Sequence, residues 1–303
     1  MPLVTSKQLL EDARQERYAV GAFNANNMEM VQAIIEAAEE ESAPVIVQIS
    51  EGAVRYAGLE YCAAMVSAGA RLAAVPVVLH LDHGASFESN MRALRAGYSS
   101  LMFDGSSLTY EENIAVTSLV ARAAHAAGVP VEAELGQVPM VRDRASAEQV
   151  QQAMTDPEGV AEFVRRAGCD SLAIAVGSVH HMQEREAELE QQRIRACSAA
   201  SPVPLVLHGS SGVRHESVRE AIENGICKIN VGTYLSAGFT EVMRAESTRR
   251  ASEIDPRKIL MAARAEVKER VREKIRLFGS SGRAGGASPR NGYLPAVGFA
   301  AVE

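Results

Sequence analysis

The sequence lacks the features that mark several classes of protein. It has only four cysteines in 303 residues, and they show no short paired spacing. We therefore predict reduced thiols in a cytoplasmic protein, without a disulfide or a cysteine–zinc framework. No apolar run approaches the roughly 18 to 20 residues that span a bilayer, and the N-terminal residues lack the apolar core of a signal peptide. We expect no contact with a membrane.

Blocks of basic residues are missing as well. Lys and Arg number 31 against 38 for Asp and Glu, so the formal net charge is −7. No segment interleaves aromatic with basic side chains, and this argues against a nucleic-acid partner. What the chain does contain is typical of a globular protein, with 47% hydrophobic and 23% charged residues.

Short apolar segments recur along the chain, and each precedes a stretch with helical spacing. They are rich in Val, Ile, Leu and Ala, as expected for strands of a parallel sheet that is covered on both faces. The eight predicted strands are residues 18–24, 44–50, 75–83, 99–105, 130–135, 171–177, 204–210 and 227–233. This pattern predicts an α/β fold, a (β/α)8 TIM barrel closed by a long helix near residues 257–278. An open doubly wound sheet is the alternative, but the segment GAFNANN after the first strand is not its Gly-rich turn.

We expect a single domain over residues 1–278. Residues 279–303 are rich in Gly, Ser and Pro, a composition that predicts a disordered tail. The loop over residues 136–155 is longer and more charged than its counterparts, which suggests a lid over the mouth of the barrel.

Three histidines follow predicted strands. His83, His180 and His208 come after the third, sixth and seventh strands. The C-terminal strand ends of a TIM barrel converge around one axis and carry its reactive groups, and three imidazoles with an open position form a catalytic zinc site. For any one histidine, a hydrogen-bonded place in the core is the more common role. Three of the chain's seven at strand ends favour a metal site.

Other residues near these strand ends have both a structural and a catalytic interpretation. His80 lies within its strand and is expected in the core or behind the metal ligands. His181 follows His180 directly, and neighbouring side chains on an extended chain face opposite ways, so the pair does not easily bind one ion. Asp82 is either a turn or salt-bridge residue, or a carboxylate held beside the metal for acid–base catalysis.

Two turns of small residues follow the last two predicted strands. They read HGSSG at residues 208–212 and NVGT at residues 230–233. Backbone N–H groups and hydroxyls in such turns bind phosphate, and TIM barrels often have a phosphate site at this position.

Taken together, these residues resemble the class II, zinc-dependent ketose-bisphosphate aldolases. The similarity covers roughly residues 1–283, and the matching motifs are AFNANNME (22–29), SEGAVRYAG (50–58), VPVVLHLDHG (75–84), VEAELG (131–136), AVGSVH (175–180), PLVLHGSSG (204–212) and KINVGT (228–233). The resemblance implies a TIM barrel, usually a homodimer or homotetramer, that reversibly cleaves a ketose bisphosphate into dihydroxyacetone phosphate and an aldehyde. The motif SEGAVRYAG favours fructose 1,6-bisphosphate over tagatose 1,6-bisphosphate as the substrate.

The resemblance also implies roles for single residues. His83, His180 and His208 would bind Zn²⁺, which polarises the ketone and stabilises the enediolate. Asp82 would move the proton on the C4 oxygen as the C3–C4 bond breaks. Asn230 would contact the enediolate.

The resemblance also assigns residues to the two phosphates of the substrate and to the surroundings of the metal. Asp104 and Glu134 resemble acidic residues near the metal and offer a second metal position. A Na⁺ or K⁺ ion is expected near the first phosphate, and Lys268, or alternatively Arg264, is expected at the other one. The remaining candidates for substrate binding are Asn24, Ser50, Gly209, Ser211, Gly232 and Thr233.

The chain departs from the family in the segment that corresponds to a mobile loop, which reads QVPMVRDRA. Pro139 and Met140 replace a glycine pair, and Pro139 stiffens the hinge. Arg142 replaces the acidic residue that exchanges the proton at the carbon nucleophile. Asp143 or Glu148 is the candidate substitute for that acid.

Two further positions depart from the family, since His181 replaces a glycine beside the phosphate and cation sites and Tyr234 replaces a commonly acidic residue. One alternative is therefore an aldolase for another phosphorylated ketose, such as tagatose 1,6-bisphosphate, a deoxy-keto-acid phosphate or a sulfosugar phosphate, with Arg142 and His181 recognising an anion. Another is a weakly active metal-binding homologue with a scaffold role. A zinc hydrolase is disfavoured, because the first strand lacks a His-x-His pair.

Overall fold

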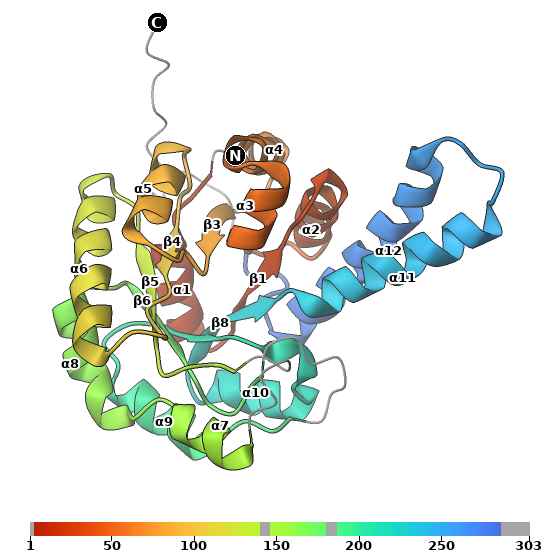
Figure 1. Cartoon of the computed structure of the whole chain (residues 1–303). Helices are drawn as coiled ribbons and strands as arrows, with labels where there is room; N and C mark the ends of the chain where they lie inside the picture. Colours follow the sequence, from red (N-terminus) through yellow and green to blue (C-terminus); the bar gives the residue numbers. More distant parts are fainter. Residues whose placement is uncertain (1–2, 140–145, 180–186, 286–303) are drawn as a thin grey trace, which may run out of the picture.

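The computed structural model describes residues 3–139, 146–179 and 187–285. Eight parallel strands form one sheet in the order β3-β2-β1-β8-β7-β6-β5-β4. The two edges of this sheet meet, because the Leu81 N–H in β3 donates to the carbonyl of Ser100, next to β4, at 3.0 Å. Helices surround the strands (Figure 1), which confirms the predicted (β/α)8 TIM barrel.

Strands and helices alternate along the chain. The strands are Val20–Asn24 (β1), Val45–Ser50 (β2), Val77–Asp82 (β3), Leu101–Phe103 (β4), Val131–Leu135 (β5), Ser171–Ile174 (β6), Leu205–Leu207 (β7) and Ile226–Val231 (β8). The helices are Ser6–Glu16 (α1), Met28–Glu40 (α2), Glu51–Ala57 (α3), Leu59–Leu72 (α4), Phe87–Arg95 (α5), Tyr110–Ala126 (α6), Ala147–Ala153 (α7), Pro157–Ala167 (α8), Gln191–Ala200 (α9), His215–Glu223 (α10), Thr233–Arg249 (α11) and Pro256–Leu277 (α12). None of the helices in the described ranges has the length and apolar composition needed to cross a membrane.

Several strands end earlier than the sequence predicts. β6 stops at Ile174 because the next N–H, of Ala175, donates to the Thr155 hydroxyl at 2.8 Å instead of continuing the sheet. β7 stops at Leu207, and Gly209 then takes a left-handed φ of 67°, which a strand does not allow. The chain leaves the sheet at these points and forms the loops around the barrel mouth.

One end of the barrel is closed by apolar side chains. Leu9 and Leu10 of α1 form a buried cluster with Val20, Ile46 and Val78, which lie near the beginnings of β1, β2 and β3. This cluster removes apolar surface from water and seals the N-terminal end of the strands. The C-terminal ends are left as the open mouth.

α11 and α12 pack against each other and together reach beyond the barrel (Figure 1). The inner part of α12 packs along α2, where Lys268 and Arg264 form ion pairs with glutamates of that helix. Ile254, in the connection between α11 and α12, is 95% exposed, and Met261 near the start of α12 is 67% exposed. Two apolar side chains at the outer end of this projection therefore face solvent in the single chain.

The described residues that follow the predicted domain boundary at residue 278 contact the barrel. The backbone N–H groups of Gly282 and Ala284 donate to the carbonyls of Glu41 and Ser42, each at 2.8 Å. This segment therefore packs against the end of α2, whereas residues 286–303 of the predicted tail lie outside the described residues.

Candidate active site

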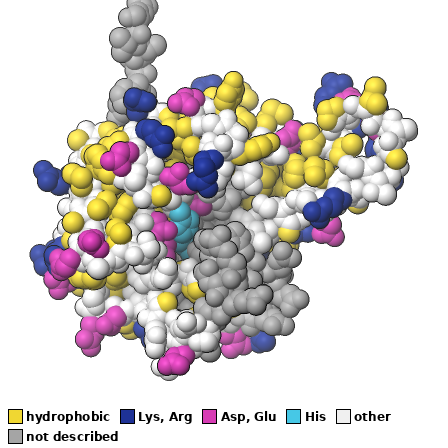
Figure 2. Space-filling view, viewed as in Figure 1, with side chains coloured by type: hydrophobic (Ala, Val, Ile, Leu, Met, Phe, Trp, Pro, Cys, Tyr) yellow, Lys and Arg dark blue, Asp and Glu magenta, His cyan; other side chains and the backbone are white. Residues whose placement is uncertain are grey.

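A cavity of about 910 Å³ opens at the mouth of the barrel. Polar side chains from the strand ends and the loops that follow them form its wall, and on the face shown in Figure 2 a histidine is visible between acidic side chains. The cavity brings together these residues predicted from the sequence: Asn24, Ser50, Asp82, His83, Asp104, Glu134, Gly209, Ser211, Asn230, Gly232 and Thr233.

Three donors at this mouth are grouped like metal ligands. One ligand atom each of His83, Glu134 and His208 lies within 4.8 Å of the other two. Glu134 Oε2 is 3.1 Å from His208 Nδ1 and 3.9 Å from His83 Nδ1, yet it has no well-oriented hydrogen bond to a described residue. A buried carboxylate oxygen that faces two imidazoles in this way is what a divalent cation would satisfy. The residues present therefore fit a metal ion.

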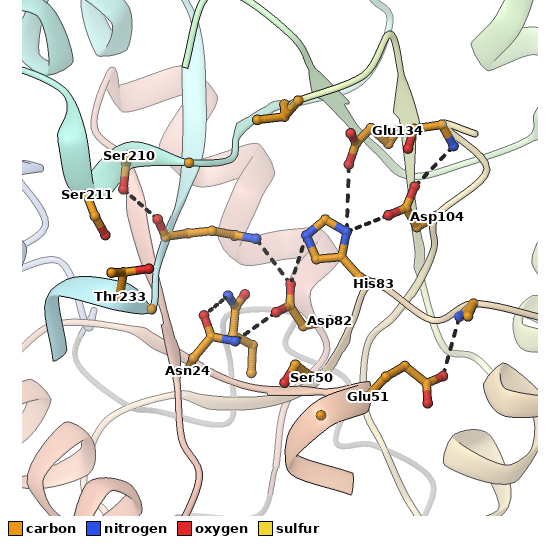
Figure 3. Close-up of a pocket in the computed structure, with 18 of the residues that line it drawn as sticks. Asn24, Ser50, Glu51, Asp82, His83, Asp104, Glu134, Ser210, Ser211 and Thr233 are labelled. Carbon is orange, nitrogen blue, oxygen red and sulfur yellow. Dashed lines mark hydrogen bonds and ion pairs between the residues drawn. The ribbon is translucent and has the colours of Figure 1, made fainter. Parts of the chain in front are cut away.

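His83 enters the cavity through an unusual backbone conformation. Its φ of 51° lies in the left-handed region, which costs a non-glycine residue about 1 to 3 kcal/mol. Nδ1 lies 2.7 Å from Asp104 Oδ2, and Nε2 lies 3.8 Å from Asp82 Oδ1 (Figure 3). Burial lowers the pKa of His83, but the charges of Asp82, Asp104 and Glu134 outweigh it and raise the pKa to about 10. This excess of negative charge would also stabilise a bound cation.

Beneath these ligands lies a layer of buried polar side chains. Glu132 Oε1 is 3.1 Å from His208 Nε2 and accepts a hydrogen bond from Lys228 Nζ at 3.0 Å. Burial raises the pKa of the Glu132 carboxyl, but the Lys228 ammonium and the His208 ring hold it well below its usual range. Because the Glu132 carboxylate occupies Nε2 of His208, Nδ1 is the nitrogen directed at Glu134. Burial, followed by the Lys228 charge, lowers the pKa of His80 to about 3, so that ring is neutral.

Sequence reasoning missed four charged residues of this region. Glu132 and Lys228 lie inside apolar strands, and a charged side chain in such a strand is buried only with a partner. The need of a buried charge for an opposite charge is the one signal in the sequence that could have predicted the ion pair between Glu132 and Lys228. Glu51 and Arg55 line the cavity from α3 and belong to the motif SEGAVRYAG, but no spacing in the sequence separates them from ordinary surface residues of a helix.

Asp82 is held by side-chain amides beside the three candidate metal ligands. Asn24 Nδ2 donates to Asp82 Oδ2 at 2.7 Å, and Asn230 Nδ2 donates to Oδ1 at 3.3 Å (Figure 3). Gln48 Nε2 in turn donates to Asn24 Oδ1 at 2.8 Å and fixes that amide. Burial raises the pKa of Asp82, but the positive charges of His83 and of other basic groups nearby outweigh it and lower the pKa. The result is an ionised carboxylate that can accept a proton in the cavity.

The two turns of small residues lie together at one side of the cavity. Gly209, with its left-handed φ, starts a short 3₁₀ turn. The Tyr234 N–H donates to Ser211 Oγ at 3.3 Å, which ties this turn to the first turn of α11. A methyl group on Gly232 would lie 2.7 Å from Asn24 Oδ1, so this close approach requires glycine. Gly209, Ser211, Gly232 and Thr233 of these turns all line the cavity, and turns of small residues are a kind of segment that can bind an anion.

Some of the predicted site residues lie elsewhere. Lys268 Nζ pairs with Glu40 of α2 at 2.8 Å, and Arg264 pairs with Glu36 of the same helix. Neither side chain lines the cavity, so in this chain neither is placed to meet a second phosphate there. Glu148 is exposed on α7. Five predicted positions lie outside the described residues, namely Met140, Arg142, Asp143, His180 and His181.

Comparison with known proteins agrees with this geometry. Residues 4–283 match the family model described as Fructose-bisphosphate aldolase class-II. The chain is 42% identical to the fructose-bisphosphate aldolase of Thermus caldophilus, with 93% of this chain and 100% of that protein covered. It is 44% identical to the probable fructose-bisphosphate aldolase of Bacillus subtilis (strain 168), with 94% and 100% covered.

A solved structure of an aldolase is also similar to this chain. The crystal structure of the YdjI aldolase from Escherichia coli K12 superposes with a TM-score of 0.80 and 38% sequence identity, over 93% of this chain and 99% of that one. The family match and these relatives confirm the resemblance read from the motifs. The chain belongs to the class II fructose-bisphosphate aldolase family.

Proposed function

We propose that this protein is a zinc-dependent aldolase that reversibly cleaves fructose 1,6-bisphosphate into dihydroxyacetone phosphate and glyceraldehyde 3-phosphate. The observation that carries the proposal is the Asp82 carboxylate, held by two side-chain amides beside the group His83–Glu134–His208, in a cavity that is also lined by the two turns of small residues. An aldol cleavage needs a base for a hydroxyl proton, an electrophile at the ketone and a site for phosphate. The names of the relatives support fructose 1,6-bisphosphate as the sugar.

The metal is proposed to be Zn²⁺, held by His83, His180 and His208. Imidazole nitrogens and carboxylate oxygens are ligands that zinc accepts. Once bound, the ion supplies Lewis-acid polarisation of the substrate ketone. Asp104 and Glu134 hold the imidazole of His83 and are proposed to offer a second position for a metal.

Asp82 is proposed to transfer the proton of the cleavage step. In the cleavage direction its carboxylate accepts the proton of the C4 hydroxyl, the C4 oxygen becomes a carbonyl, and the electron pair of the C3–C4 bond moves toward the C2 carbonyl. In the aldol direction Asp82 returns the proton. Asn230 is proposed to contact the oxygen on the three-carbon fragment, and Asp143, or alternatively Glu148, is proposed to exchange the proton at C3.

The dihydroxyacetone phosphate end is proposed to bind at the two turns of small residues. Backbone N–H groups and hydroxyls in turns of small residues can bind phosphate, which supports this proposal, and a Na⁺ or K⁺ ion is proposed beside the phosphate. The residues proposed to contact the substrate are Asn24, Ser50, Gly209, Ser211, Gly232 and Thr233.

The assembly is proposed to be a homodimer or homotetramer. The exposed Ile254, in the connection between α11 and α12, and the exposed Met261 of α12 support this proposal, because exposed apolar patches mark protein–protein interfaces. We place the enzyme in the cytoplasm, a choice supported by four buried cysteines that form no disulfide.

A coupled assay tests the function directly. The purified protein is given fructose 1,6-bisphosphate, and dihydroxyacetone phosphate is detected by its enzymatic reduction, before chelation, after chelation and after zinc is added back. We expect turnover that the chelator abolishes and Zn²⁺ restores. Turnover that survives complete metal removal would contradict the metal mechanism. Zinc-loaded protein that cleaves tagatose 1,6-bisphosphate but not fructose 1,6-bisphosphate would contradict the choice of sugar.

A further inference from the structure

An ion pair lies inside the barrel, where side chains are normally apolar. Lys228 of β8 and Glu132 of β5 are both buried, and Lys228 Nζ lies 3.0 Å from Oε1 and 2.8 Å from Oε2 of the carboxylate. Since β6 and β7 separate these two strands in the sheet, the contact crosses the interior of the barrel. TIM barrels commonly fill this space with Val, Ile and Leu, so the pair does more than fill the core.

Stability alone does not account for this ion pair. Two charges lose their hydration when they are buried, and replacing a buried ion pair by uncharged side chains of similar volume is often neutral or stabilising. The imidazole of His80 does not need the carboxylate either, because its Nε2 lies 3.9 Å from Glu132 Oε2, beyond hydrogen-bond distance. The pair is therefore better explained by another neighbour of Glu132.

That neighbour is the imidazole of His208, which is fully buried. Its Nε2 lies 3.1 Å from Glu132 Oε1, and its Nδ1 lies 3.1 Å from Glu134 Oε2. A neutral imidazole has a proton on one nitrogen and a lone pair on the other, and only the lone pair can bind a metal ion. Because a carboxylate lies at each nitrogen, the ring itself does not decide which of them keeps the proton.

The Lys228 ammonium makes these two carboxylates different. Among the described residues, it forms its ion pair with Glu132 and not with Glu134. The ammonium favours the charged form of Glu132, which has no proton of its own and accepts one from Nε2 of His208. The ring proton is then held on the core side, and the lone pair of Nδ1 is directed toward Glu134 at the mouth of the barrel.

We propose that Lys228 and Glu132 are positioning residues, which hold the proton of His208 on Nε2 and thereby keep Nδ1 available to the metal. The inference rests on the proposed function, because it assumes that His208 is a metal ligand. Neither Lys228 nor Glu132 lines the cavity, so both act through the imidazole. Acceptors behind a metal-binding histidine typically change metal affinity by about 10-fold to 100-fold.

The test uses a variant that removes both charges together. Glu132→Gln/Lys228→Met keeps the approximate size of each side chain and leaves no charge without its partner, so we expect it to fold as stably as the wild type. The Gln amide can donate to Nε2 of His208, and the Glu134 carboxylate, as the charged acceptor, then draws the ring proton to Nδ1. The variant therefore favours the tautomer in which Nδ1 cannot bind a metal.

Zinc affinity is the direct readout, measured on metal-free protein by competition with a chromophoric chelator at one pH. We expect the dissociation constant of Zn²⁺ to rise by about 10-fold to 100-fold in the double variant. Asp170→Asn is the matched control, because it also turns a well-bonded carboxylate into an amide, next to the beginning of β6. Its zinc affinity should stay within about twofold of the wild type. At saturating zinc, KM for fructose 1,6-bisphosphate should also stay within about twofold in the double variant, because the cavity wall is unchanged.

Several results would overturn the positioning role. One is a zinc affinity in the folded double variant within about twofold of the wild type, and another is an equal loss in Asp170→Asn. A raised KM at saturating zinc would show a distorted cavity instead. Failure to fold, both of the double variant and of Lys228→Met, would show that the pair serves the barrel and not the metal.

The measurement also separates this inference from the proposed reaction. Zinc affinity is measured without substrate, so a wild type that binds zinc but cleaves no sugar contradicts the reaction alone, and the zinc affinities still decide the role of the pair. A wild type that binds no zinc would overturn both.

Discussion

The residue on which the chemistry depends most is Asp82, which is buried and nevertheless ionised. Burial by itself favours the neutral acid, but nearby positive charges and the Asn24 amide lower the pKa of this carboxyl. Asn24 and Asn230 each donate to one of its oxygens, so the group is fixed in orientation as well as in charge. Both properties are needed for a base that must accept one particular hydroxyl proton.

The change Asp82→Asn keeps the shape of the side chain and removes the base. We expect kcat for fructose 1,6-bisphosphate to fall by about a hundredfold to ten-thousandfold, the usual contribution of a positioned acid–base group. Metal content should remain that of the wild type, because Asp82 is not part of the group His83–Glu134–His208. Kinetics and elemental analysis on one preparation measure both. A variant that loses its metal would show instead that Asp82 supports the metal site.

At the scale of secondary-structure elements, one carboxylate links three parts of the barrel. Asp170, in the connection between α8 and β6, accepts hydrogen bonds from Lys7 Nζ of α1 and from the Val131 N–H of β5, each at 2.9 Å. His125 Nε2 of α6 lies 2.7 Å from the same carboxylate. Burial raises the pKa of Asp170, but these three partners outweigh it and lower the pKa. The folded protein therefore holds this carboxylate in its ionised form.

A lowered pKa has a defined effect on stability. The ionised Asp170 carboxylate contributes fully to the free energy of unfolding at pH values above the pKa of an aspartate in the unfolded chain, which is about 3.9. This contribution is lost as the pH falls through the lower pKa that Asp170 has in the folded protein. Asp170→Asn removes the titration, so the free energy of unfolding should fall less steeply between about pH 5 and about pH 3 than in the wild type. Urea unfolding at several pH values measures this, with Glu60→Gln on the exposed side of α4 as the control. An unchanged pH dependence in Asp170→Asn would contradict the assignment.

At the scale of the whole molecule, the local sequence pattern predicted the barrel. The ends of its strands and the pairing of its buried charges depend instead on contacts between residues that are distant in the sequence. The strands could be predicted because both of their faces are buried, so the composition of each short segment is enough. The early end of β6 depends on Thr155, which lies 20 residues away in sequence. The bond between Lys228 and Glu132 joins residues 96 apart, and no local spacing contains it.

It was equally hard to predict which side chains of a helix face the cavity. Lys268 belongs to a helix with many charged residues, and the sequence does not say which side of α12 meets α2. The structure directs that side chain to Glu40, and it brings Arg55 to the cavity wall instead. The convergence of strand ends in a TIM barrel predicts which loops meet, but not which side chain of a following helix turns inward.

The end of the described chain offers a test of how far the domain extends. Beyond α12, Ser280 is fully buried, Arg283 pairs with Glu16 of α1, and two backbone hydrogen bonds attach the segment to the end of α2. A chain that ends at Phe278 loses all of these contacts, whereas a chain that ends at Gly285 keeps them. Each backbone hydrogen bond contributes about 0.5 to 1.5 kcal/mol net. We therefore expect the shorter chain to have a free energy of unfolding lower by about 1 to 3 kcal/mol than the longer one.

Urea unfolding of the two truncated chains, side by side, measures this difference. The comparison isolates residues 279–285, because everything beyond Gly285 is absent from both chains. Since these residues attach to α1 and α2 and none of them lines the cavity, kcat/KM should be the same in both chains at temperatures where both are folded. Equal unfolding midpoints would place the end of the domain at α12, as the composition of the sequence suggested. A lower midpoint for the chain that ends at Phe278 would show that a segment rich in Gly and Ser helps to close the barrel.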